Sequence, residues 1–415
     1  MAVILLALGS RGDVQPMAVL AGELTRRGQA ARVVATSDFA GLAAGCGADF
    51  VSIAADSREA VAMTHARFGR QLFSHPLGQA WLLRRWLALI AEPVADACLE
   101  SIGPGDVVLS GILTRGVGLA LAEARGARLV TVLHTGQVPT RYAESHFAFD
   151  HFRGRATYDL RGARLSWRIA SGLGAPAAYL ARAKLGLPRL AAGATAGAAD
   201  AFPVIVAASP LVVPPAHDWP KNVVSTGYPT PRQESFAPDA ELAAFLDAGP
   251  EPVYVGFGSL GASGAHDNLA PVIEAARLSG RRIVTPAVGG AAAGSIDRRV
   301  HVIDSVPHDW LLPRMAAVIH HGGAGTTWAG LLSGRPSVAV PFGVDQPYQA
   351  HRLHGLGVGP EPIPVQRLSG TSLARLIAQA TSGSYDERAA EVGRVARAED
   401  GTEATIAALT RWGYL

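Results

Sequence analysis

The sequence predicts an α/β protein made of two Rossmann-like domains that face each other across a cleft. Short apolar runs alternate with amphipathic segments in both halves of the chain, at the spacing of βαβ units. A proline-rich stretch separates the two series. In each series, polar glycine-rich loops directly follow apolar runs, which is where ligands bind in open parallel sheets.

The bulk composition is that of a well-packed globular protein. The 415 residues suffice for two domains of about 200 residues each. Hydrophobic residues make up 49% of the chain and charged residues 17%, which excludes a disordered protein. The net charge of +3 gives no electrostatic reason to expect a nucleic-acid partner. The excess of alanine and glycine is typical of a GC-rich bacterial genome.

Cysteine content and hydropathy indicate a cytoplasmic protein. Two cysteines, Cys46 and Cys98, are too few for a disulfide framework or a four-cysteine metal site. The opening run MAVILLALGS is short and lacks a basic leader, so we expect a buried first strand and not a signal peptide. The chain contains no run of 18 apolar residues, and we therefore expect no stable membrane insertion.

Residues 1–210 are predicted to form the first domain. Val3–Leu8 is a continuous apolar run, as expected for a parallel strand covered on both faces. A helix follows, with Pro16 expected in its first turn and Gly28 after its last. Further strands are expected at ARVVAT, FVSIA, DVVLS and RLVTVL. Residues 141–190 interrupt this rhythm, and form either surface helices or a wall of an acceptor pocket.

The rest of the chain is predicted as a linker, a second domain and a final helix. Residues 211–233 are rich in proline and are expected to form a stiff interdomain linker. Residues 234–395 repeat the βαβ pattern, with strands expected at PVYVGFGS, RRIVTPAV, AAVIHH and PSVAVP. Residues 396–415 are expected to form a helix that crosses back to the first domain.

The stretch HHGGAGTT, His320–Thr327, has the composition of a phosphate-binding loop. Its glycines allow the backbone to approach a ligand closely, and its threonines lie at the mouth of a predicted helix. Free N–H groups and the helix dipole there favour an anion such as a diphosphate. The alternative is a tight turn with a buried histidine. The loop is not a Walker motif, because no Gly-Lys-Ser/Thr follows.

Two carboxylates also occupy loops that follow predicted strands. Asp345 and Gln346 are suited to bind vicinal hydroxyls, although the pair could equally begin a helix. Asp13 follows the first strand and could act as a general base. Its alternative roles are helix capping and a salt bridge with Arg11.

Several motifs together resemble those of inverting, nucleotide-sugar-dependent glycosyltransferases of the GT-B fold. They are GSRGDVQPMAVLAGELTRRG, WPKNVVSTGY, PVYVGFGS, SVPHDWLLPRMAAVIHHGGAGTT and RPSVAVPFGVDQPYQAHRLHGLGVG. The chain is similar above all to bacterial natural-product glycosyltransferases of the glycopeptide and macrolide type and to sterol glucosyltransferases. The resemblance spans nearly the whole chain and is weak over residues 141–190.

The resemblance implies a donor site in the second domain. The diphosphate would be held by the loop around His321 and by Ser259, and donor-sugar hydroxyls by Asp345 and Gln346. Val306 would contact the base. Many relatives stack a tryptophan on the base where this chain has Ser305, so Trp310 or His308 is expected to substitute. The full set of expected donor contacts is Ser10, Arg11, Gly12, Ser259, Val306, His308, Trp310, His321, Gly323, Ala324, Gly325, Thr326, Asp345 and Gln346.

The resemblance also implies an acceptor site in the first domain. Many relatives have a catalytic histidine at the position of Asp13, paired with an aspartate at the position of Ser110. Since both are replaced here, Asp13 is expected to act as the base, with His134 as the rival base. Ser110, Thr135 and Phe147 are the expected acceptor contacts.

The implied reaction is transfer of a sugar from UDP or dTDP to a hydroxyl of a hydrophobic secondary metabolite. In-line attack inverts the anomeric carbon, so an α-linked donor gives a β-glycoside. The absence of an Asp-x-Asp triplet agrees with a reaction that needs neither metal nor cofactor. A monomer or homodimer is expected. The alternatives are a nucleotide-sugar epimerase or hydrolase on the same fold, and a catalytically weak activator of another transferase.

Overall fold

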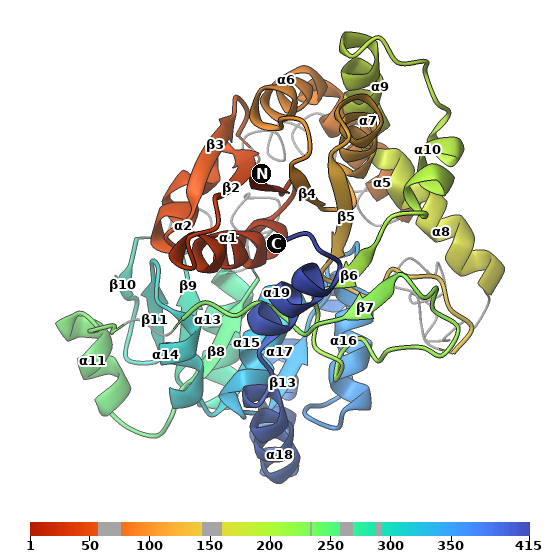
Figure 1. Ribbon diagram of the computed structural model, residues 1–415. Helices are drawn as coiled ribbons and strands as arrows, with labels where there is room; N and C mark the ends of the chain where they lie inside the picture. Colours follow the sequence, from red (N-terminus) through yellow and green to blue (C-terminus); the bar gives the residue numbers. More distant parts are fainter. Residues whose placement is uncertain (57–75, 143–159, 233–234, 258–268, 288–291) are drawn as a thin grey trace. The chain divides into compact units, whose positions relative to one another are not determined.

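The computed structural model describes residues 1–56, 76–142, 160–232, 235–257, 269–287 and 292–415 (Figure 1). The chain divides into two compact units. The first comprises Met1–Pro231 together with Asp400–Leu415, and the second comprises Arg232–Glu399. Two predicted site residues, Phe147 and Ser259, lie outside the described residues.

The first unit is built on a parallel sheet with strand order β3-β2-β1-β4-β5-β6-β7. The order reverses beside β1, because the chain moves first to one side of this strand and then to the other. Its strands are β1 (Val3–Leu6), β2 (Ala31–Thr36), β3 (Asp49–Ile53), β4 (Val107–Ser110), β5 (Arg128–Leu133), β6 (Val204–Val206) and β7 (Val223–Ser225).

Helices cover both faces of this sheet. Alternate side chains of β1 enter two different cores: Val3 and Leu5 join one, and Ile4 and Leu6 join the other. The first core is covered by α1 (Arg11–Arg26), α2 (Ala40–Gly45) and α19 (Gly401–Arg411). The second is covered by α5 (Pro76–Leu89), α6 (Ala91–Ser101), α7 (Arg115–Arg125) and α9 (Ala175–Lys184), beside which lie α8 (Leu160–Leu173) and α10 (Ala192–Ala199). The continuous apolar run at the N-terminus is therefore a strand buried on both faces.

Helix α1 begins earlier than the sequence predicts. Its first residue is Arg11, so Pro16 lies inside the helix and the prediction that it occupies the first turn is wrong. The reason is a capping box at Ser10 and Asp13, which starts the helix five residues before the proline. Gly28 follows the end of the helix with φ +80°, a left-handed conformation that suits glycine.

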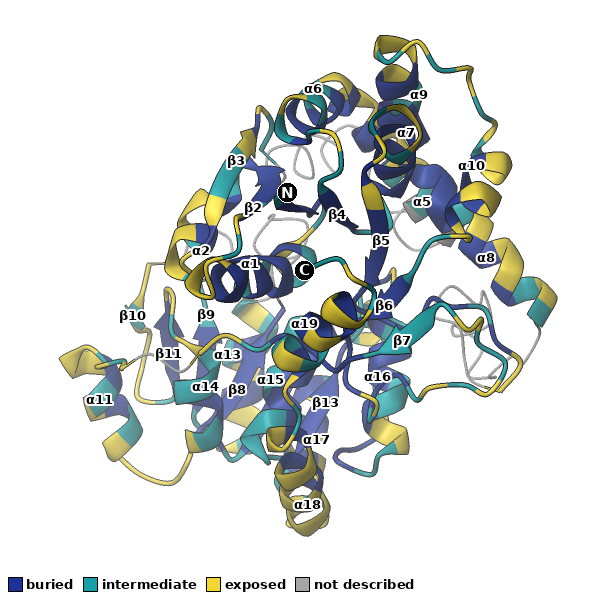
Figure 2. Ribbon diagram, in the orientation of Figure 1, coloured by how far each residue is buried: buried dark blue, intermediate teal, exposed yellow. Residues whose placement is uncertain are grey.

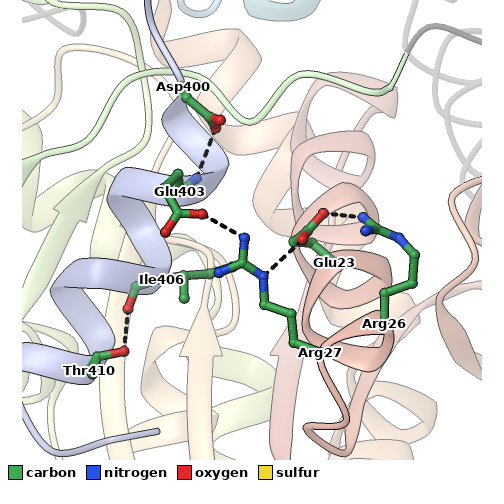
Figure 3. A network of polar contacts seen from close by, with 7 residues as sticks. All are labelled: Glu23, Arg26, Arg27, Asp400, Glu403, Ile406 and Thr410. Carbon is green, nitrogen blue, oxygen red and sulfur yellow. Dashed lines mark hydrogen bonds and ion pairs between the residues drawn. The ribbon is translucent and has the colours of Figure 1, made fainter.

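Two segments far along the sequence complete the first unit. Strand β7 lies within residues 211–233 and pairs in parallel with β6, so this proline-rich stretch adds a strand to the sheet. Helix α19 packs on α1 (Figure 3). There Arg27 contacts both Glu23 (2.8 Å) and Glu403 (2.5 Å), and Asp400 caps α19 by accepting the N–H of Glu403 at 2.9 Å.

The second unit has a six-stranded sheet of order β10-β11-β9-β8-β12-β13, in which β10 alone runs antiparallel to its neighbour among the described strands. The strands are β8 (Val253–Gly256), β9 (Ile283–Pro286), β10 (Gly294–Ser295), β11 (Val300–Ile303), β12 (Ala317–His320) and β13 (Ser337–Ala339). Figure 2 shows strands β8 and β13 of this unit as buried, whereas helices such as α11 (Ala240–Asp247) and α18 (Asp386–Arg397) carry many exposed residues.

Helices also cover both faces of the second sheet. Val253 and Val255 pack against α13 (Leu269–Ser279) and α17 (Gly370–Ala380), whereas Tyr254 packs against α11 (Ala240–Asp247) and α14 (His308–Leu311). Helices α15 (Ala324–Ser333) and α16 (Gln346–Gly355) follow β12 and β13, and α18 (Asp386–Arg397) packs on α15. Among the described helices of both units, none combines the length and apolarity needed to cross a bilayer.

Candidate active site

The loop after β12 is shaped by His320. This residue is fully buried, and its Nδ1 accepts the N–H of Gly322 at 3.0 Å. Since Nδ1 is the acceptor, Nε2 carries the proton and donates to Ser337 Oγ at 3.2 Å. Burial, reinforced by His321 and His308, lowers the pKa of His320 to about 3, so the ring is neutral at pH 7. Neutral His320 therefore fixes the turn, in which Gly322 adopts φ +88°.

His321 is held at the entrance of helix α15. Its backbone N–H donates to the carbonyl of Gly256 on β8 at 3.1 Å. A Cβ at Gly323 would lie 2.4 Å from His321 Nε2, so the imidazole occupies the space that any larger residue would need. Its Nδ1 is buried and makes no hydrogen bond with the described part of the chain. Burial lowers the pKa of His321 to about 4, and the neutral ring retains one N–H donor for a ligand.

The first backbone N–H groups of helix α15 have no capping side chain. Gly323 is the N-cap and has no side chain to accept them, and the described first turn contains no acidic residue. The first N–H groups of a helix have no partner within the helix, and they lie at the positive end of its dipole. The N–H groups of Gly323, Ala324, Gly325 and Thr326 and the His321 ring therefore form a site suited to an anion.

The Asp345-Gln346 pair lies beside this loop. Strands β12 and β13 are parallel neighbours, so their following loops meet at one edge of the sheet. A Cβ at Gly322 would lie 3.1 Å from the carbonyl oxygen of Gln346, which shows how closely the two loops approach. Gln346 Oε1 accepts the N–H of Phe342 at 2.7 Å, so part of this side chain holds its own loop.

The loop before α16 is strained at one residue. Val344 has φ +57°, which is unfavourable for a β-branched side chain, and it is 46% exposed. Asp345 follows it as the N-cap of α16, and its side chain makes no capping hydrogen bond. The Asp345 carboxylate is therefore not used to start the helix, which was one of its two predicted roles.

The segment between β11 and β12 holds the three residues expected at the nucleoside. Val306 packs on the core that contains Leu311. His308 Nε2 lies 3.2 Å from the hydroxyl of Tyr254. Trp310 contacts Phe236 edge-on, with ring centroids 5.0 Å apart, and the Arg314 guanidinium lies 4.2 Å from its ring centroid. Both His308 and Trp310 thus already contact neighbouring side chains, and base stacking on either remains a prediction.

In the first unit, Asp13 lies at the start of α1. Its Oδ2 accepts the backbone N–H of Ser10 at 2.7 Å and the Ser10 hydroxyl at 3.0 Å, while Ser10 Oγ accepts the N–H of Gly12 at 3.2 Å. Gly9 has φ +143°, and a Cβ there would lie 2.3 Å from Asp13 Oδ2. Glycine is therefore required so that the carboxylate can fit. Arg11 is exposed and bonds to Gln15 at 3.2 Å.

His134 interacts electrostatically with Asp13. Burial raises the pKa of Asp13, against the opposing effects of His134 and of the Ser10 hydrogen bonds. Burial lowers the pKa of His134, against the opposing effect of Asp13, so the ring is neutral at pH 7. Its Nδ1 lies 3.4 Å from the carbonyl of Ala207 and must donate, which leaves Nε2 unprotonated. Nε2 is buried without a hydrogen-bond partner in the described residues.

Tyr228 belongs to the same cluster and was missed by sequence reasoning. Its ring lies edge-on to His134, and its pKa is raised by burial and by Asp13. The signal was present in the motif WPKNVVSTGY, which ends in Tyr228. Nothing in that motif indicated a contact with the loop after β5.

The predicted acceptor contacts have different surroundings. Ser110 is fully buried and its hydroxyl is 2.8 Å from Thr114 Oγ1 and 3.1 Å from the carbonyl of Gly111, so it joins β4 to the following loop. Thr135 is buried next to His134, and its hydroxyl has no hydrogen-bond partner in the described residues. The Ser110 hydroxyl therefore already has hydrogen-bond partners, whereas the Thr135 hydroxyl has none among the described residues.

Comparison with known proteins places the chain in a family. A profile described as "Erythromycin biosynthesis protein CIII-like, C-terminal domain" matches residues 272–407, which include the loops after β12 and β13. The vancomycin aglycone glucosyltransferase of Amycolatopsis orientalis is 32% identical over 414 residues, covering 96% of this chain and 95% of its own. The chain belongs to this family of glycosyltransferases.

The chain is also similar to a longer glucosyltransferase from a plant. Sterol 3-beta-glucosyltransferase UGT80A2 of Arabidopsis thaliana is 30% identical over 425 residues. The match covers 98% of this chain but only 65% of that relative. The residues compared include both the Asp13 loop and the His321 loop.

Solved structures show that the fold is that of GT-B glycosyltransferases. The glycotransferase of kitacinnamycin has a TM-score of 0.69 at 20% identity, covering 99% of this chain and 98% of its own. The glycosyltransferase VinC, solved in complex with dTDP, has a TM-score of 0.64 at 21% identity and covers 99% of both chains. At 20% and 21% identity, the similarity to these two structures shows a shared fold and no more.

Proposed function

We propose that this glycosyltransferase transfers a sugar from a UDP- or dTDP-sugar to a hydroxyl of a hydrophobic small molecule. The observation that carries the proposal is the uncapped start of α15 with His321 held against Gly323. Four backbone donors and one imidazole converge there, and no described side chain accepts from them as a cap. A diphosphate has the charge and the oxygen atoms to satisfy these donors.

The donor sugar would lie next to the diphosphate. The loops after β12 and β13 are in contact, so a sugar attached to the bound diphosphate comes within reach of Asp345 and Gln346. As the bond from sugar to phosphate breaks, negative charge grows on the diphosphate, and the same donors stabilise it. We propose that they do so without a metal ion.

The acceptor hydroxyl would lose its proton to Asp13. Asp13 as a whole residue is half-buried, whereas the rival base His134 is only 8% exposed. Burial makes Asp13 more basic by raising its pKa, which is favourable for a general base. The acceptor oxygen forms a bond to the anomeric carbon, the nucleoside diphosphate leaves from the opposite side, and the configuration inverts. A positioned base contributes about 10²- to 10⁴-fold to such a step.

The class of acceptor is proposed from the relatives. The similar proteins act, by their names, on a sterol or on the vancomycin aglycone. Both are bulky molecules with a reactive hydroxyl. We therefore propose a hydrophobic aglycone as acceptor.

The test is sugar transfer by an Asp13→Asn variant, measured with UDP-glucose and dTDP-glucose and a panel of hydroxylated aglycones in EDTA. Asparagine can still accept the Ser10 hydrogen bonds, so α1 should remain capped. We expect transfer to fall at least 100-fold while nucleotide affinity is kept. An Asp386→Asn variant, which changes an exposed residue of α18, serves as the control. If Asp13→Asn is fully active and His134→Ala is not, the base is His134.

A further inference from the structure

The loop between β13 and α16 contains a turn of unusual sequence. The N–H of Gln346 donates to the carbonyl of Gly343 at 3.1 Å, which closes a four-residue turn with Val344 and Asp345 at its centre. Val344 has φ +57°, and Asp345 has φ −89° and ψ −10°. A positive φ at the first central residue, followed by these angles at the second, is the pattern of a type II′ turn. Glycine is the usual residue at that first position, and this chain has valine there.

Hydrogen bonds on both sides of the turn hold Val344 in this conformation. Gln346 Oε1 accepts the N–H of Phe342 at 2.7 Å and that of Gly343 at 3.4 Å, so α16 is tied to the residues before the turn. Within the described ranges, Val344 is the one residue other than glycine with a left-handed φ. A β-branched side chain is unfavourable there, and the conformation persists only where the surrounding structure enforces it.

Packing does not explain why this position is a valine. Val344 is 46% exposed, whereas Val338 and Val340, which lie just before it in the chain, are 1% and 0% exposed. Those two join a hydrophobic core of the second unit, and Val344 belongs to neither core described for this unit. Glycine would remove the strain with little loss of buried apolar surface. Strain that packing does not offset is typical of residues at ligand-binding sites.

Val344 lies at the proposed site of the donor sugar. It directly precedes Asp345, and its loop contacts the loop after β12, because a Cβ at Gly322 would lie 3.1 Å from the carbonyl oxygen of Gln346. Both loops are at the carboxyl edge of the parallel sheet, where the diphosphate site is proposed. A sugar that is attached to a diphosphate at the start of α15 and reaches Asp345 therefore passes the exposed side chain of Val344.

We propose that Val344 determines which donor sugar is accepted, and that it selects a 6-deoxyhexose over the corresponding hexose. The inference rests on the proposed function, because it concerns the sugar of the same donor. Asp345 and Gln346 are suited to vicinal hydroxyls, and in a hexopyranose these are the ring hydroxyls. The remaining hydroxyl stands apart on the exocyclic carbon. A methyl group at that carbon packs on Val344, whereas a hydroxyl there loses its water without gaining a partner.

The experiment is calorimetric titration of the full chain with UDP and dTDP and with their glucose and 6-deoxyglucose derivatives, in the absence of acceptor. We expect the wild type to bind the 6-deoxyglucose derivative of its nucleotide about tenfold more tightly than the glucose derivative. Val344→Thr keeps the volume and the β-branch but offers a hydroxyl to the sugar. Its preference should fall to about twofold or less, while its affinity for the free nucleoside diphosphate stays unchanged.

The matched control is Val395→Thr. Val395 lies on α18 and is 50% exposed, so the same polar change is made at a valine of similar exposure without a left-handed φ. This variant should keep the tenfold preference of the wild type.

Urea unfolding of glycine variants tests the strain separately from any ligand. Val344→Gly should unfold at a urea concentration equal to or higher than that of the wild type, because glycine relieves the left-handed φ. Val395→Gly should unfold at a lower urea concentration, because it places glycine inside a helix. Val344→Gly should also lose the preference between the two sugars. A clearly lower midpoint for Val344→Gly would show that the valine serves stability, which would overturn the proposal.

Three titration results would also overturn the proposal. If the wild type binds a nucleoside diphosphate but binds both of its sugar derivatives equally, the diphosphate site stands and the inference on Val344 is wrong. If Val344→Thr keeps the full preference and changes only the KM of an acceptor, Val344 contacts the acceptor. If the wild type binds neither UDP nor dTDP, the proposed function fails, and the inference fails with it.

Discussion

Tyr228 lies edge-on against His134, with ring centroids 6.2 Å apart and ring planes inclined by 63°. The contact links the candidate base site to the C-terminal helix. A Cβ at Gly401, the first residue of α19, would lie 2.6 Å from the backbone nitrogen of Tyr228. Packing of α19 within the first unit therefore restricts the backbone of Tyr228, and the ring of Tyr228 contacts His134.

Replacing Tyr228 should expose His134 to water. In Tyr228→Leu the loss of the ring removes part of the burial that lowers the pKa of His134, so this pKa should rise toward 6.5. We expect transfer to fall about tenfold, whereas Tyr228→Phe should behave nearly as wild type because it keeps the ring. NMR titration of the histidine ring protons measures the pKa without any substrate. An unchanged His134 titration in Tyr228→Leu would show that the ring does not shield it.

Gly9→Ala should displace the Asp13 carboxylate. The added Cβ would lie 2.3 Å from Oδ2, and φ +143° is unfavourable for alanine. We expect a loss of about 1–3 kcal/mol in the free energy of unfolding and transfer nearly as slow as in Asp13→Asn. Gly126→Ala is the control, because Gly126 has φ +65° but open space around its Cβ position. The steric account fails if the control loses as much transfer activity as Gly9→Ala.

The contact between Gly323 and His321 predicts non-additive effects on nucleotide binding. His321→Ala removes one ligand hydrogen bond and should weaken the affinity for UDP or dTDP about tenfold. Gly323→Ala should weaken it similarly, because the new Cβ would lie 2.4 Å from His321 Nε2 and would displace the ring. In the His321→Ala background the Gly323 substitution should add less than about 0.5 kcal/mol. Strictly additive losses would mean that Gly323 acts independently of the imidazole.

The lowered pKa values of His320 and His321 predict loss of stability in acid. The pKa is about 3 for His320 and about 4 for His321, both below the ordinary value of 6.5. The unfolded chain therefore binds more protons, and the free energy of unfolding falls as the pH drops from about 6.5 toward 4. Each histidine contributes up to about 1.4 kcal/mol per pH unit in this window.

Urea unfolding at several pH values in this window tests the effect. His320→Gln should make the dependence on pH shallower, whatever its effect on the stability at pH 7. His217→Gln, which changes an exposed histidine, should leave the slope unchanged. If the free energy of unfolding of His320→Gln depended on pH as steeply as that of the wild type, His320 would be protonated as easily in the folded chain as in the unfolded one.

Most of the strands could be predicted because buried parallel strands are continuous apolar runs. The residues of β1, β4 and β12 are examples, and all are buried. Strands β6, β7 and β11 were not predicted, and the three residues of β7 lie among prolines that indicate a linker. Strand β10 has two residues and no apolar pattern, so only its pairing with β11 identifies it.

The positions of the two proposed donor loops could be predicted from the sequence. The His321 loop and the Asp345 pair follow neighbouring strands, so local sequence already places them at one sheet edge. The contact of Tyr228 with His134 depends instead on the order β5-β6-β7, which brings together two loops from distant parts of the sequence. The requirement for glycine at position 9 follows from the distance between its Cβ position and Asp13 Oδ2. The sequence alone does not give this distance.

The most direct test of the central claim is calorimetric titration of the purified chain with UDP and with dTDP, both in EDTA. The account predicts micromolar binding of at least one nucleotide, and weaker binding after His321→Ala. Such a result would identify the donor class and assign the diphosphate to the start of α15. Absence of binding by both nucleotides to the folded wild-type chain would contradict the claim that His320–Thr326 forms a diphosphate site.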